Sequence, residues 1–190
     1  MNDLNDWGWK LREAIIKLKD SYDHIGRSTG APFLGLVYPP EAETAVLKEW
    51  RVLTSSLEDD FALKTIDVLA LTMEVVDEIG VEAIVDTIKD PMPGADPERD
   101  LGKLWVERVI DQVLASTDAS ASKKPVVILE RTAALYPVAG PRAVMEGLWS
   151  HNQSELPGPV VVFIPGTLVQ PRVYSFLNQQ EEFMYRGDIL

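Results

Sequence analysis

Two continuous runs of apolar, mostly β-branched residues constrain the fold of this chain more than any other feature. They are PVVILE at residues 125–130 and PVVVFI at residues 159–164. Neither run alternates between apolar and polar residues, which is typical of strands covered on both faces in a parallel sheet. Parallel strands need long crossover connections, usually helices. The two runs therefore predict an α/β fold.

The rest of the chain continues this alternation of strands and helices. Further strands are predicted at residues 33–38, 62–68 and 181–190, and helices at residues 7–26, 40–57, 69–80, 81–90, from 97 to 114, and from 141 onward. The helix at 69–80 is apolar on nearly every side, which predicts that it is buried. We expect one α/β domain over residues 1–190, with about five strands in a mostly parallel sheet flanked by helices. Residues 1–30 form an amphipathic helix and loop, and residues 31–190 form the sheet and its flanking helices.

Composition excludes several classes of function. The chain has 30 acidic and 18 basic residues, and its net charge of −12 opposes direct binding of nucleic acid. Because there is no cysteine, disulfides, thiolate nucleophiles and Cys-based zinc sites are excluded. No apolar run approaches the roughly 20 residues that span a bilayer. The start of the sequence has no signal-peptide pattern either, so we expect a cytoplasmic protein without membrane contact.

The order of elements resembles that of P-loop NTPases, but a phosphate-binding loop is missing from the sequence. GxxxxGK[ST] occurs nowhere, and no GxGxxG follows any predicted strand. Pro165, Gly166 and Thr167 follow the second apolar run. A proline removes one N–H group and a single glycine allows a turn, so this segment predicts a turn and not a phosphate cradle.

Ligands of open parallel sheets bind at the carboxyl ends of the strands, so the candidate binding residues lie there. Glu130 ends an apolar run as the acidic residue of a Walker B strand does; the alternative is a polar residue that simply ends a buried strand. Arg131 and Arg186 lie at or near predicted buried strands. Each either pairs internally, with Glu130, Asp188 or a helix carboxylate, or is exposed for recognition. The full candidate set is Glu41, Glu130, Arg131, Thr132, Pro165, Gly166, Thr167 and Arg186.

No catalytic or metal site is predicted. His24 and His151 are far apart in the sequence and match neither HxxxH nor HExxH, and no serine lies in a G-x-S-x-G elbow. We therefore expect no cofactor and no enzymatic activity.

The last third of the chain resembles the BrxB family of bacteriophage-exclusion (BREX) defence systems. The resemblance rests on Arg131, Leu135 and Pro137 after the first apolar run, on PGTL at residues 165–168, and on the YR pair at residues 185–186. The strand FLGLVYPPEAE also resembles a strand of that family, whereas residues 80–124 do not align. The resemblance implies a cytosolic accessory protein that blocks phage replication beside a large ATPase, a phosphatase-like protein and a DNA methyltransferase.

Three functions follow as hypotheses. The first is a non-catalytic adaptor that works through protein contacts, with the large ATPase and the phosphatase-like protein as the expected partners. The second is a degenerate nucleotide-binding domain in which Glu130 and Thr167 hold a nucleotide without hydrolysis. The third is a hydrolase that depends on the Glu130 carboxylate. The sequence leaves open which surface binds a partner and whether the chain self-associates.

Overall fold

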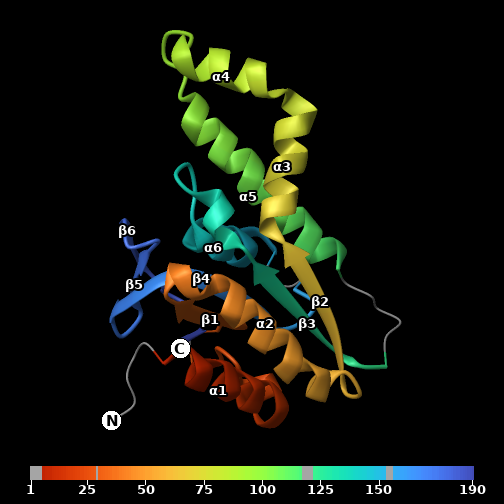
Figure 1. Cartoon of the computed structure of the whole chain (residues 1–190). Helices are drawn as coiled ribbons and strands as arrows, with labels where there is room; N and C mark the ends of the chain where they lie inside the picture. Colours follow the sequence, from red (N-terminus) through yellow and green to blue (C-terminus); the bar gives the residue numbers. More distant parts are fainter. Residues whose placement is uncertain (1–5, 29, 117–121, 153–155) are drawn as a thin grey trace.

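The computed structural model describes residues 6–28, 30–116, 122–152 and 156–190 (Figure 1). It confirms a single α/β domain with a mostly parallel sheet. The parallel strands run in the order β2-β3-β4-β1-β7. Their bounds are Phe61–Asp67, Lys124–Glu130, Val160–Gln170, Phe33–Tyr38 and Asp188–Ile189, in that order. A hairpin of β5 (Val173–Phe176) and β6 (Gln180–Phe183) extends the sheet antiparallel to β4.

Helices cover both faces of the sheet, which explains why residues 125–129 of β3 and 160–164 of β4 are apolar at every position. Helices α1 (Trp7–Asp20) and α2 (Glu43–Thr54) lie on one face, and α3 (Val68–Ile79), α5 (Pro97–Ala115) and α6 (Pro141–Asn152) on the other (Figure 1). Within β4, Val161 and Phe163 join the core under α1 and α2, whereas Val160, Val162 and Ile164 join the opposite core. Alternate residues of a strand point to opposite faces, so one apolar run supplies both cores.

Helix ends follow local signals where those signals are strong. Asp96 caps α5 by accepting a hydrogen bond from the backbone N–H of Arg99 at 3.2 Å, and Pro97 occupies the first helical position, where the helix was predicted to begin. The first helix is shorter than predicted. It ends at Asp20, and a separate 3₁₀ turn, Tyr22–His24, precedes Gly26. Gly26 has a φ of 63°, a left-handed conformation that glycine adopts without strain, so the chain can turn there after the 3₁₀ turn.

Helices α3, α4 (Val81–Lys89) and α5 form an arm that extends beyond the sheet, with α4 at its tip (Figure 1). The prediction that the segment 69–80 is fully buried is wrong. Val68, Leu71 and Val75 are buried, but Leu69, Met73 and Ile79 are 42%, 50% and 41% exposed. The helix packs against α5 along one side, and the residues on its other side are only partly covered by the described chain.

The C-terminal third departs from the predictions in two places. Pro165, Gly166 and Thr167 do not form a turn, because β4 continues through them to Gln170. Tyr38 pairs with Pro165 at the end of the β1–β4 ladder, and Gly166 then pairs with Phe176 of β5. Proline has no N–H for a ladder, and it lies where β4 changes partners. The single strand predicted at residues 181–190 is instead split between β6 and β7.

Candidate functional site

The carboxyl ends of β2 and β3 bring most of the charged candidates together. Asp67 is paired with Glu130 in the parallel register, and Arg131 follows directly. Tyr38, at the end of β1, donates a hydrogen bond from its hydroxyl to Glu43 Oε2 at 2.9 Å. A cluster of paired charges therefore lies at this edge of the sheet, as the topology of a parallel sheet predicts.

Glu130 is the most buried charged residue of this cluster, with a side chain 5% exposed. Its Oε2 accepts a hydrogen bond from Arg51 Nη2 of α2 at 3.4 Å. Burial raises the pKa of Glu130, and the nearby Arg51 guanidinium partly opposes this rise by favouring the ionised form. The carboxylate connects β3 to the helix packed against it. An acidic residue at the end of this apolar strand is therefore explained by its ion pair with Arg51 of α2.

Arg131 pairs with a carboxylate that the sequence did not single out as its partner. Its Nη1 lies 3.0 Å from Asp67 Oδ2, and both side chains are about two-fifths exposed, at 42% and 38%. The other Asp67 oxygen, Oδ1, accepts from the backbone N–H of Ala70 at 3.3 Å and caps α3. Arg131 has a φ of 57°, so the chain turns sharply where β3 ends. Asp67 and Arg131 therefore fix the base of the arm to β3.

The other predicted residues at this edge are held by hydrogen bonds and close packing. Thr132 is buried, and its hydroxyl donates to the carbonyl of Phe163 at 2.6 Å. Thr167 donates to Asn178 Oδ1 at 2.7 Å, on the hairpin. A side chain at position 166 would meet the backbone of Ser175, so the glycine allows β4 and β5 to approach each other. Glu41 is exposed in the short 3₁₀ turn before α2.

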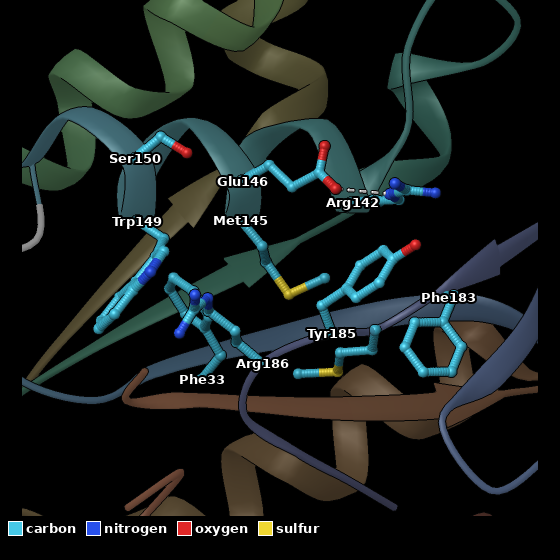
Figure 2. A pocket seen from close by; sticks show the side chains of 10 residues that line it. Phe33, Arg142, Met145, Glu146, Trp149, Ser150, Phe183, Tyr185 and Arg186 are labelled. Carbon is cyan, nitrogen blue, oxygen red and sulfur yellow. Dashed lines mark hydrogen bonds and ion pairs between the residues drawn. The ribbon is translucent and has the colours of Figure 1, made fainter. Parts of the chain in front are cut away.

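Arg186 does not belong to this edge of the sheet, contrary to the predicted grouping. It precedes Asp188, which pairs with Leu34 near the amino end of β1. Its guanidinium lies over the ring of Trp149 on α6, with 4.8 Å to the ring centroid. Figure 2 shows it lining a separate hollow under α6. Sequence order could not reveal this, because the position depends on how the last strand joins the sheet.

The arm carries the surface that sequence reasoning missed. Helix α4 has apolar residues at helical spacing, yet none of its residues is buried. The apolar residues of the arm with 36% or more of their surface exposed are Leu69, Met73, Ile79, Val81, Val85, Ile88, Met92 and Leu104. The spacing within residues 81–88 was visible in the sequence and predicted a helix. Its exposure was not visible, because that depends on what packs against the helix.

The arm is also strongly acidic. Residues 68–115 contain 11 Asp and Glu residues against four Lys and Arg residues, which leaves −7 of the chain's net charge of −12. Arg108 of α5 binds two of these acids, with Nη2 at 2.6 Å from Glu78 and Nη1 at 3.7 Å from Glu74 of α3. Apolar side chains are thus exposed on a surface of negative charge.

Other kinds of site find no support in the part of the chain that the structure describes. There, no group of three or more acidic or imidazole side chains could hold a metal ion, and His24 is exposed. The polar composition of residues 116–124 predicts a surface loop, and most of this segment lies outside the described residues, as does the side chain of His151. Within the described residues, no helix is both long and apolar enough to cross a membrane.

Comparison with known proteins adds nothing to these features. No family model, no curated protein and no solved structure matches the chain.

Proposed function

We propose that the protein is a non-catalytic adaptor that binds another protein through its arm. The observation that carries this proposal is α4, a helix with apolar residues at helical spacing and no buried residue. An amphipathic helix gains most of its stability by burying its apolar side. In the described chain that side is only partly covered, with Val81, Val85 and Ile88 54%, 38% and 36% exposed, and exposed apolar surface of this kind is typical of protein interaction sites.

The negative charge of the arm indicates which kind of partner it can bind. A second copy of this chain would place one acidic arm against another, which costs free energy through like-charge repulsion. A partner with a basic and apolar segment would meet both the negative charge and the exposed Val81, Val85 and Ile88. We therefore propose that the arm binds a basic, amphipathic segment of a different protein.

The resemblance to the BrxB family supports the same class of function. It implies an accessory role in BREX phage defence, beside a large ATPase and a phosphatase-like protein. These two proteins are the partners to test first.

The test is a quantitative pull-down with the tagged full chain from the native host, followed by direct titration of each recovered protein in purified form. The Val81→Ser/Val85→Ser variant removes apolar surface from α4 without changing its charge. We expect it to weaken partner binding at least about tenfold, because apolar contacts at the centre of an interface dominate its energy. Binding should also weaken as salt rises, because exposed charges are screened.

The matched control is Ile16→Ser/Val52→Ser, which removes two exposed apolar side chains from α1 and α2 on the other layer. It should bind as the unmodified chain does. Equal binding by all three proteins would overturn the assignment to the arm. A chain that binds neither expected partner but binds Mg-ATP at micromolar concentration would favour the degenerate nucleotide-binding domain instead.

A further inference from the structure

A hollow of about 320 Å³ lies between α6 and the segment that follows β6 (Figure 2). Its most deeply buried lining residues are apolar: Phe33, Met145 and Met184 are 1%, 5% and 2% exposed. Charged side chains of the hollow include Arg142, Glu146 and Arg186. An apolar interior with a few polar groups is typical of small-molecule sites, and the volume is at the lower end of their range.

Both arginines of the hollow are stacked on aromatic rings. Arg186 lies over Trp149 at 4.8 Å, and Arg142 lies over Tyr185 at 5.0 Å from the ring centroid. A guanidinium over the face of an aromatic ring is attracted to it by a cation–π interaction, which holds the group beside the ring. Arg142 Nε also donates to Glu146 Oε1 at 2.7 Å. The hollow therefore combines two cations held beside aromatic rings with one carboxylate, in a chain that is acidic as a whole.

The wall of the hollow is held in place by a third arginine. Arg172, in the turn between β4 and β5, donates from Nε to the carbonyl of Met184 and from Nη2 to those of Tyr185 and Gly187, at 3.0, 3.0 and 3.2 Å. The rings of Phe183 and Tyr185 also pack edge to face, with centroids 4.6 Å apart. A site whose wall is fixed before binding loses less entropy when a ligand enters.

We propose that this hollow binds a small organic anion, namely a carboxylate or a phosphate attached to an aromatic or apolar body. The anionic group meets the guanidinium groups of Arg142 and Arg186, whose planar N–H pairs match carboxylate and phosphate oxygens. The body of the ligand packs on the buried thioethers and rings. A cation is repelled by the arginines, and inorganic phosphate gains nothing from the apolar interior. None of these residues belongs to the arm, so this site does not depend on the adaptor proposal.

The experiment is an NMR titration of the full-length, ¹⁵N-labelled chain with phenyl phosphate and with indole-3-acetate. The signals of the indole N–H and arginine Nε–H groups are monitored. The neutral comparison probe is indole-3-ethanol. We expect saturable shifts of the Trp149 and Arg186 signals with both anions, and at least about tenfold weaker binding of the neutral probe, as the loss of a charge-assisted hydrogen bond implies. Equal affinity for the anionic and neutral probes would overturn the proposal. So would unmoved Trp149 and Arg186 signals.

Two variants locate the site. Arg186→Gln removes the charge of an exposed residue, so the fold should survive, and the anions should bind about tenfold more weakly. Arg99→Gln makes the same change on α5, at an exposed residue that does not line the hollow, and should leave the affinity unchanged. Thermal melting of both variants checks folding. An equal loss of affinity in the two variants would mean that the anions bind to general positive charge, and the proposal would fail.

Discussion

Glu130 and Arg131 are neighbours in sequence but have different surroundings. Glu130 is buried and contacts Arg51 on α2, whereas Arg131 is two-fifths exposed and contacts Asp67 at the end of β2. The sequence predicted that both lie at a strand end, because an apolar run stops immediately before them. The sequence could not predict that Arg51 and Asp67 are their partners. Arg51 approaches β3 only because α2 packs against the sheet, and Asp67 only because β2 pairs with β3.

The stability of the fold should depend on pH through Glu130. Because burial raises its pKa above the usual 4.5, the folded state binds the proton more tightly than the unfolded state does. This contribution to stability is complete below about pH 4.5 and is lost as pH rises through the raised pKa. Glu130→Gln is neutral at every pH. We therefore expect its free energy of unfolding, measured by urea titration, to rise relative to the unmodified chain as pH increases from 4.5 to 7.

A second variant separates the two influences on this carboxyl group. Arg51→Gln removes the cation that favours the ionised form and leaves the burial, so the loss of stability with rising pH should become steeper. The opposite result for Glu130→Gln, a relative stability that falls as pH increases, would mean that the attraction of Arg51 outweighs the cost of burial.

Among the elements, those with strong local signals were predicted correctly. The runs 125–130 and 159–164 form β3 and the first part of β4, and Asp96 with Pro97 starts α5. The errors occur where the pairing of distant segments decides the structure. Pro165 and Gly166 have the composition of a turn, but the approach of β5 keeps them in a strand. Arg186 was placed at the wrong edge because it precedes β7, whose Asp188 pairs with Leu34 near the amino end of β1.

The start of α3 offers a test of one side chain with two contacts. Asp67→Asn keeps an oxygen that can accept from the Ala70 N–H but weakens the ion pair with Arg131, so it should lower the free energy of unfolding by at most about 1 kcal/mol. Asp67→Ala also removes the helix cap, and we expect it to cost about 1 kcal/mol more. Urea denaturation of both variants measures the difference.

Arg131→Ala is the matched control for this comparison. It removes the ion pair and leaves the cap, so its effect on the free energy of unfolding should resemble that of Asp67→Asn. If Asn and Ala at position 67 lower stability equally, the Ala70 hydrogen bond does not contribute to the stability of α3.

At the scale of the whole molecule, stability should be unevenly distributed. Strands β3 and β4 lie between two cores, whereas α4 has no buried residue. We predict that native-state hydrogen exchange is fastest at the amides of α4 and slowest in β3 and β4, where exchange requires global unfolding. Mass spectrometry of exchanged peptides from the full chain gives this order. Protection of α4 equal to that of the central strands would contradict it.

Because α4 lies at the tip of the arm, the residues exposed on it differ from the residues that stabilise the fold. Residues 81–89 belong to neither core of the sheet and none of them is buried, so we expect most side-chain substitutions there to leave the fold intact. Under the proposed adaptor function, substitutions at the tip of the arm can follow a changing partner without a cost in foldability. We then expect α4 to diverge faster among homologous chains than the strands of the sheet do.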